Sequence, residues 1–370
     1  MDFLIEALSQ VTYKMVIMWI MGGTLIFLAI KYEMEPALLL PIGFGAILVN
    51  IPLSNVLTAN GEVGIISWLY EIGIGTSEAL PILLFIGIGA MIDFEPLIVN
   101  PKLMILGAFA QLGIFLTIIL AALLGFSIND SAAIGIIGAA DGPTSILVAL
   151  KLGSKYVGPI MVVAYSYMAL VPIIQPAVIK CITTKKERLI RMEYKGKRVS
   201  KTVKILFPIV ITMVAGLIAP KSLALVGFLM FGNLLNECGV LGTLADTAKN
   251  TLCNLITLLL GITIAFQMQA ENFLSPETLM ILALGLFAFV FDTVGGVMCA
   301  KFINLFSKNK INPMVGAAGI SAFPMSARVV HKMGLKEDST NYLLMHAVGA
   351  NVSGQIASAI VGGLIIGLVL

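Results

Sequence analysis

Charged residues are scarce in this sequence. Asp, Glu, Lys and Arg make up 12% of its 370 residues, whereas a soluble chain normally carries about a quarter. Hydrophobic residues make up 59%, and the mean hydropathy is +1.02. Both departures favour a chain embedded in a lipid bilayer over a soluble domain.

Residues that build common catalytic and metal centres are also few. The four cysteines show no paired spacing, and two histidines, His331 and His346, are too few for a transition-metal site. The sequence has no Gly-x-Ser-x-Gly with a partner histidine and no His-Glu-x-x-His, which disfavours intramembrane hydrolysis. The net charge of +3 comes mostly from one short segment, which argues against nucleic-acid binding.

The sequence does contain a series of apolar runs. About 20 apolar residues are needed for a helix to cross a bilayer. The runs are near-continuous rather than alternating, which favours helices over a β-barrel. We therefore expect an all-α polytopic membrane protein with about ten transmembrane or half-membrane helices. The runs cover residues 15–30, 36–53, 79–92, 103–126, 157–179, 205–219, 222–236, 250–268, 278–300 and 344–370.

The two halves of the chain resemble each other across a basic segment. The matching positions, 181 residues apart, are Gly138, Pro143, Lys151 and Gly153 with Gly319, Pro324, Lys332 and Gly334. We therefore divide the chain into a first transmembrane repeat (1–179), a basic loop (180–204) and a second transmembrane repeat (205–370). If each half crosses the membrane an odd number of times, the repeats are inverted and broken helices meet near the midplane.

A polar segment interrupts the apolar runs in the first half. It reads Gly-Ala-Ala-Asp-Gly-Pro-Thr-Ser at residues 138–145, and Gly142 with Pro143 disfavours a continuous helix. An aspartate at membrane depth costs about 2.5–3.5 kcal/mol on insertion scales, so Asp141 is a candidate functional residue. Asp141 could instead cap the helix that begins at Pro143. The two interpretations are compatible, because a cap at a helix break is where an ion would bind.

Two further polar segments lie in the second half. Residues 312–328 contain several Gly and Pro breaks together with Ser321 and Arg328. Arg328 lies either near a membrane edge or inside the membrane as a counter-charge and anion ligand. Residues 349–355 include Asn351 and Gln355, one helical turn apart and so facing the same interior, with Ser353 between them. The alternative for this segment is helix packing, with Asn351 as an interhelical hydrogen bonder.

Other interior polar residues have less context. Tyr165 and Tyr167 follow the first break and serve either packing or proton transfer, and Asp292 is a further interior acid. The available ligands are carboxylate, amide, hydroxyl and carbonyl oxygens, which favour a hard cation, Na⁺ or H⁺. Both ions would compete for Asp141, so Na⁺ should bind more weakly as the pH falls.

The three polar segments together resemble the β subunits of sodium-translocating biotin-dependent decarboxylases, which include the oxaloacetate, methylmalonyl-CoA and glutaconyl-CoA enzymes. The resemblance rests on GAADGPTS at 138–145, NPMVGAAGISAFPMSAR at 312–328 and NVSGQ at 351–355, and it covers most of the chain. It implies that Asp141 and Asn351, with Ser321, bind Na⁺. It also implies roles for Tyr167, Ser321 and Arg328 in ion or proton transfer and in the carboxybiotin pathway.

The same resemblance extends to other site residues and to partners. Asn312 and Gly316 match polar and close-packing positions of the second segment, and Ser353 and Gln355 are further polar candidates. The family's chemistry implies that carboxybiotin arrives on a partner subunit and is decarboxylated here, while a proton is consumed and Na⁺ moves outward.

The resemblance also implies a translocase in the bacterial inner membrane. Its expected partners are a biotin carrier, a carboxyltransferase, a small membrane anchor, membrane lipid and further copies of this chain. The sequence has no Met-Lys-Met biotinylation motif, in agreement with a subunit that receives biotin. A stand-alone secondary Na⁺-coupled transporter with the same repeats is the alternative.

The basic loop predicts the orientation of the chain. Residues 180–204 contain ten Lys or Arg against two Glu, and short basic loops stay on the cytoplasmic side. In a variant that keeps only Cys181, an impermeant thiol reagent should label inverted vesicles and leave intact cells unlabelled. Labelling of Cys181 from outside intact cells would contradict this orientation.

Overall fold

The computed structural model describes residues 2–33, 36–59, 61–76, 78–193 and 199–370. Within these ranges the chain forms helices joined by loops and no β-strand, which confirms the expected all-α class. Seven of the described helical stretches are long and apolar enough to cross a membrane, or eight if the bent pair 65–75 and 79–91 is one span. Each of the ten predicted apolar runs lies largely in a helix, so the chain is a multi-pass membrane protein.

The helices are numbered in chain order, with η marking short 3₁₀ or π turns. The first half contains α1 (Asp2–Ser9), α2 (Tyr13–Tyr32), α3 (Pro36–Val49), α4 (Ile65–Tyr70), η1 (Glu71–Gly75), α5 (Ala79–Met91), α6 (Glu95–Val99), α7 (Leu103–Phe109), α8 (Leu112–Leu123), α9 (Ile128–Gly135), η2 (Ile136–Ala139), α10 (Gly142–Lys151) and α11 (Val157–Ile182). The rest contains α12 (Lys185–Arg188), α13 (Lys201–Ile218), η3 (Pro220–Ser222), α14 (Leu223–Glu237), α15 (Gly242–Asp246), η4 (Thr247–Leu252), α16 (Cys253–Ile264), η5 (Ala265–Gln267), α17 (Ala270–Phe273), α18 (Pro276–Phe306), α19 (Pro313–Ala317), α20 (Met325–Glu337) and α21 (Leu344–Val369).

The same order of elements occurs in both halves. In the first half, α7 and α8 precede the broken segment α9–η2–α10, and α11 follows it. In the second half, α18 precedes the broken segment α19–α20, and α21 follows it. The matched prolines stand at corresponding places, since Pro143 lies in the first turn of α10 and Pro324 directly precedes α20. This order agrees with the sequence repeat, while an inverted relation between the halves, and the division at 180–204, stay predictions.

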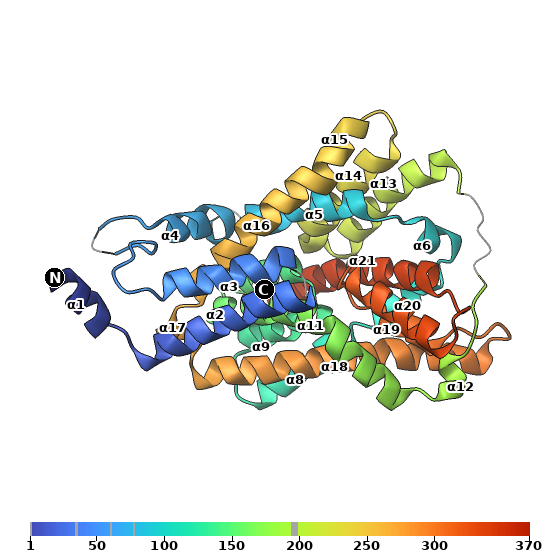
Figure 1. The fold of residues 1–370 in the computed structure, drawn as a ribbon. Helices are drawn as coiled ribbons and strands as arrows, with labels where there is room; N and C mark the ends of the chain where they lie inside the picture. Colours follow the sequence, from blue (N-terminus) through green and yellow to red (C-terminus); the bar gives the residue numbers. More distant parts are fainter. Residues whose placement is uncertain (1, 34–35, 60, 77, 194–198) are drawn as a thin grey trace.

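Helix α21 runs through the middle of the molecule (Figure 1). It packs against α7, α10 and α20, so it touches elements of both halves. Helix α18 packs against α8, α11, η2 and α19, and therefore also contacts both broken segments. These two long helices enclose the place where the broken segments meet.

Helix α12 of the basic loop contacts the second half of the chain. This contact lies at the end of the molecule where α6 and α12 are found, opposite α1 and α4 (Figure 1). Arg188 of α12 forms a salt bridge with Glu337 of α20, with Nε 2.7 Å from Oε1. Lys301 of α18 pairs with Glu187 at 3.0 Å. Asn312 donates from Nδ2 to the carbonyl of Arg188 at 2.8 Å. The part of the loop around α12 is therefore held against this end of the protein.

Asp338 is a third acidic residue in this contact region, and it stays ionised through its own hydrogen bonds. The N–H and the hydroxyl of Thr340 hold the pKa of Asp338 below its usual range, and the guanidinium of Arg191 lowers it further. Arg191 Nη2 lies 2.7 Å from Asp338 Oδ2. This pair is solvated and screened, so it positions the loop more than it stabilises the fold.

Two glycines allow α18 and α19 to approach closely. A Cβ added to Gly316 would collide with the carbonyl of Gly296, and a Cβ on Gly296 would collide with the carbonyl of Gly316. Only backbone separates the two helices at this point. The close-packing role expected for Gly316 agrees with this geometry.

We predict that Gly316→Ala lowers the free energy of unfolding by about 1–3 kcal/mol, because overpacking of a tight contact has that cost. Gly367→Ala is the matched control, since a Cβ on Gly367 meets nothing within 4 Å. Thermal unfolding of both variants in detergent measures the difference. Equal midpoints for the two variants would show that the α18–α19 contact is not tight.

Candidate cation site

The first broken segment contains a strained residue directly after the turn η2. The turn η2 ends at Ala139, and Ala140 has φ of 52°, in the left-handed region that costs an L-residue about 1–2 kcal/mol. Asp141 then adopts an extended conformation, with φ of −128°, and occupies the N-cap position of α10. Strained residues of this kind cluster at functional sites.

Hydrogen bonds from three neutral side chains hold the Asp141 carboxylate. Its Oδ2 accepts bonds from Thr144 Oγ1 at 2.6 Å, Gln355 Nε2 at 3.1 Å and Ser358 Oγ at 3.1 Å. The side chain is buried, with 3% of the residue exposed. In the described part of the chain no Lys or Arg forms a salt bridge with it. A buried carboxylate without a positive partner attracts a cation.

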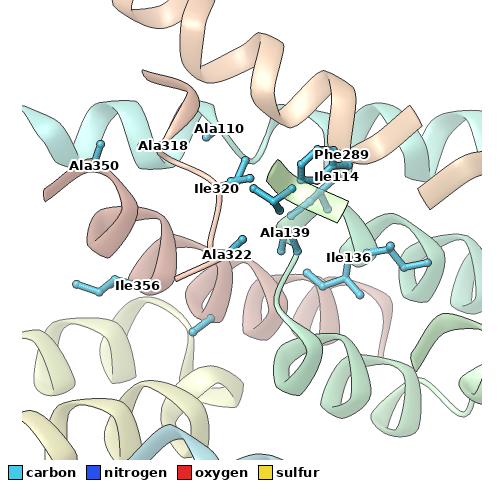
Figure 2. Close-up of a cluster of buried hydrophobic side chains, with 14 of the residues drawn as sticks. Ala110, Ile114, Ile136, Ala139, Phe289, Ala318, Ile320, Ala322, Ala350 and Ile356 are labelled. Carbon is cyan, nitrogen blue, oxygen red and sulfur yellow. The ribbon is translucent and has the colours of Figure 1, made fainter. Parts of the chain in front are cut away.

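The second broken segment meets the first at Ala139, two residues before Asp141. The N–H of Ser321 donates to the carbonyl of Ala139 at 3.1 Å, which joins the two breaks through their backbones. The Ser321 hydroxyl donates to the carbonyl of Gly354 on α21 at 3.0 Å. Figure 2 shows Ala139 beside Ile320 and Ala322 of the second segment, surrounded by apolar side chains.

The side-chain oxygen of Asn351 is a hydrogen-bond acceptor to which no described group donates. Its Nδ2 donates to the carbonyl of Ile320 at 2.6 Å, which fixes the amide against the second break. Its Oδ1 is buried and has no hydrogen-bond partner among the described residues. An unsatisfied buried acceptor costs about 1–3 kcal/mol, so this oxygen is placed for a ligand that accepts its lone pair. Asn351, Gln355 and Ser358 follow helical spacing and share one face of α21.

An amide on α11 holds the second broken segment from the other side. Gln175 Nε2 donates to the carbonyl of Ala317 at 2.8 Å and to Ser326 Oγ at 2.7 Å. These partners lie on either side of the break. Gln175 therefore fixes the end of α19 relative to the start of α20.

Three of the predicted site residues make contacts away from Asp141. Ser353 Oγ donates to the carbonyl of Leu103 at 2.9 Å and so packs α21 on α7. Asn312 caps α19, accepting from the N–H of Met314 at 3.0 Å, and fastens the basic loop. Gly316 contacts α18. These contacts favour structural roles for the three residues.

The two tyrosines of α11 differ in their surroundings. Tyr167, the residue chosen from the sequence, donates from its hydroxyl to the carbonyl of Leu282 on α18 at 2.6 Å. Tyr165 instead packs its ring against Gly142, the residue after Asp141. The Tyr165 hydroxyl is buried and unpartnered within the described residues. Tyr165 is therefore the tyrosine beside the first break.

Arg328 lies on α20 and faces a separate cleft. The cleft has a volume of about 690 Å³, and its lining includes Arg328, Lys180, Lys332 and Lys336. Arg328 is exposed and forms no salt bridge with any described residue. Arg328 is therefore not a buried counter-charge, and its guanidinium is accessible to an anion that enters the cleft.

Sequence reasoning did not choose three neighbours of Asp141 as site residues, although it considered Tyr165 together with Tyr167. Thr144 was part of the first motif but was not selected, although it lies three residues after Asp141 in the first turn of α10. Ser358 lies three residues after Gln355, so the helical spacing that linked Asn351 with Gln355 also includes it. Tyr165 had no signal that distinguished it from Tyr167.

Comparison with known proteins gives a consistent result. Residues 14–369 match the family described as the Na⁺-transporting oxaloacetate decarboxylase beta subunit. The chain is 48% identical to the methylmalonyl-CoA decarboxylase subunit beta of Propionigenium modestum, over 95% of this chain and 94% of that protein. It is 44% identical to the glutaconyl-CoA decarboxylase subunit beta of Acidaminococcus fermentans, over 100% and 99%. It is 42% identical to the oxaloacetate decarboxylase beta chain of Klebsiella pneumoniae, over 96% and 95%.

Proposed function

Because the chain belongs to the family of Na⁺-transporting decarboxylase β subunits, we propose that its crossed broken helices bind the transported Na⁺ and that the Arg328 cleft receives carboxybiotin. The chain is a multi-pass membrane subunit of a decarboxylase that transports Na⁺. The observation that carries the Na⁺ site is the buried Asp141 carboxylate, which has no salt bridge to any described Lys or Arg. Gln355 bonds to this carboxylate, and one helical turn before Gln355 lies Asn351 with its unsatisfied oxygen.

The ligand set suits Na⁺ because it combines one negative charge with neutral oxygens. Asp141 provides the charge, and Asn351 Oδ1 provides a neutral acceptor that no described donor occupies. The hydroxyl of Ser321 lies at the crossing and can turn a lone pair towards the ion. Hard oxygen donors of this kind favour hard cations.

The site is built from both halves of the chain, which links ion binding to their relative position. Asp141 belongs to the first broken segment, while Ser321 and Asn351 belong to the second half. A separation of the two segments would break the Ser321–Ala139 hydrogen bond and divide the ligands between them. Release of Na⁺ then follows from movement alone, without a change in any ligand.

The cleft around Arg328 fits an anionic group that enters from the side of the basic loop. Lys180 and Lys336 line it, and so does Glu337, which pairs with Arg188 of that loop. The guanidinium of Arg328 would bind the carboxylate of carboxybiotin and stabilise negative charge as the carboxylate leaves. Carboxybiotin supplies a carboxylated ureido nitrogen, whose decarboxylation consumes one proton.

The proposed function extends to partners and location. A biotin carrier and a carboxyltransferase would deliver the carboxyl group, with a small membrane anchor subunit and further copies of this chain completing the assembly. The curated relatives are named as β subunits or chains of decarboxylases, which supports a pump subunit over a stand-alone transporter. We place the complex in the bacterial cytoplasmic membrane, with residues 180–204 inside.

The Na⁺ site predicts ion-specific protection of the purified protein. Na⁺ at a hundred times its dissociation constant should stabilise the wild type by about 2.7 kcal/mol, while Asp141→Asn should lose this protection. Thermal unfolding in NaCl and in choline chloride of equal ionic strength measures the difference.

Asp130→Asn is the matched control, because Asp130 is also a buried aspartate held by hydroxyls, from Ser127 and Ser154. It should unfold at a lower temperature and keep the full Na⁺ effect. Equal Na⁺ protection of wild type and Asp141→Asn would show that Asp141 is not an ion ligand.

The cleft predicts the behaviour of Arg328 variants in the assembled pump. Inverted vesicles that contain the full complex should take up Na⁺ when the decarboxylase substrate is added, and avidin should block this uptake. Arg328→Lys should retain part of the uptake and Arg328→Ala should lose it, because Lys keeps the charge without the planar fork. Lys332→Ala controls for loss of positive charge elsewhere in the cleft. Normal uptake by Arg328→Ala would assign the guanidinium to the membrane edge.

A further inference from the structure

Asp292 is a buried carboxylic group that the proposed Na⁺ site does not use. It is the seventeenth residue of the 31-residue helix α18, about 25 Å from the start of that helix at 1.5 Å per residue. None of its surface is exposed. Oδ1 accepts a hydrogen bond from the N–H of Ile114, in the first turn of α8, at 3.2 Å. Oδ2 has no hydrogen-bond partner in the described part of the chain.

The unpartnered oxygen faces the first broken segment. A Cβ added to Gly138 would lie 2.5 Å from Asp292 Oδ2 and 2.9 Å from the Cβ of Ala288. Gly138 is three residues before Asp141 in the same segment. In Figure 2 Phe289 of α18 and Ile114 of α8 lie beside Ala139, in an apolar environment. The segment that carries Asp141 therefore covers Asp292.

The neighbouring elements bring no described positive charge to this oxygen. Helices α7, α8 and α19 and the turn η2 carry no titratable side chain. The titratable residues of the other packed elements are Asp130 on α9, Tyr165, Tyr167, Lys180 and Cys181 on α11, and Glu277, Cys299 and Lys301 on α18 itself, with Asp141 after η2.

Several of these groups already have hydrogen-bond or salt-bridge partners, and others lie far from Asp292 along their helices. Asp130 accepts from Ser127, Ser154 and the N–H of Lys155. Tyr167 bonds to Leu282, ten residues before Asp292, and Lys301 pairs with Glu187. Cys299 lies seven residues along α18, with its Sγ near the carbonyl of Ile105. An ionised Oδ2 would face carbon atoms with no donor, which low-dielectric surroundings strongly disfavour.

We propose that Asp292 is a proton-binding site that the first broken segment closes. While the segment stands away from α18, a proton from water bonds to Oδ2 and leaves the group neutral. The segment then packs over the neutral acid, and the proton returns to water when the segment opens again. A proton fits here better than Na⁺, because Oδ2 faces Gly138 and the methyl of Ala288 instead of further oxygen ligands.

The site is distinct from the proposed Na⁺ site but depends on the same segment. Gly138 covers Asp292, while Asp141 lies beyond it in contact with α21. One turn further along α18, Gly296 contacts Gly316 of the second broken segment. Proton occupancy of Asp292 therefore controls whether α18 and the first segment can pack together.

Infrared spectroscopy of the purified protein in saturating NaCl tests the proposal. The wild type should show a carboxylic acid C=O band that Asp292→Asn lacks. Asn keeps an oxygen for the Ile114 N–H but cannot carry an acid proton. Asp130→Asn and Asp141→Asn should retain the band. Retention in Asp141→Asn is expected whether or not that variant binds Na⁺, so this test is independent of the Na⁺ assignment.

Identical spectra of wild type and Asp292→Asn would overturn the proposal, since Asp292 would then be ionised. If Asp292→Asn fails to assemble, Asp292→Glu provides the second test. It keeps the acid and should shift the band without abolishing it. An unchanged spectrum in Asp292→Glu would also overturn the proposal.

Discussion

A bilayer offers no water to satisfy the backbone, so a helix broken at membrane depth must find hydrogen-bond partners within the protein. Most of the site follows from this constraint. Each of the two breaks satisfies part of the other, through the Ser321 N–H and the Ala139 carbonyl. Amide side chains complete the arrangement, with Gln175 bonded to Ala317 and Asn351 bonded to Ile320. Neither break would be tolerated in this position without the other.

The same constraint explains where the chain can hold a cation. Once the breaks have satisfied each other, the Asp141 carboxyl group has no salt bridge to any described Lys or Arg, and Asn351 retains an acceptor oxygen. Asp141 is fixed by the side chains of Thr144, Gln355 and Ser358. Asn351 is fixed by the carbonyl of Ile320, so the ligands are held in place before an ion arrives. Preorganisation of this kind reduces the ordering that binding requires. The structural and the ion-binding functions of these side chains are therefore difficult to separate by deletion, which is why an ion-specific measurement is needed.

Composition and apolar runs predicted the helical membrane class, because helices are the main way to satisfy the backbone in lipid. Glycine and proline located the breaks, and helical spacing placed Gln355 on the face that meets Asp141. The sequence did not distinguish Tyr165 from Tyr167, since two residues two positions apart point about 200° apart on a helix and only the packing shows which side faces the break. It likewise grouped Asn312 and Ser353 with the site, although their partners are the basic loop and α7. Whether such a residue faces the site depends on contacts between segments that are far apart in the sequence, and the local sequence pattern carries no information on these contacts.

The distance along the chain between Arg328 and Ser321 bears on how the proposed chemistry and ion movement are coupled. Arg328 lies in the first turns of α20 and faces the cleft, while Ser321 lies seven residues earlier at the crossing. Gln175 contacts Ser326, between the two, and also Ala317 at the end of α19. An anionic substrate that binds Arg328 would therefore shift a short segment whose two ends are both hydrogen-bonded to the side-chain amide of Gln175. Between these two ends lie Ile320 and Ser321, which would move with the segment. Ser321 is bonded to Ala139, and Ile320 is bonded to Asn351. Coupling between cleft and ion site thus requires only a local shift of the second break, and no long chain of intermediate contacts.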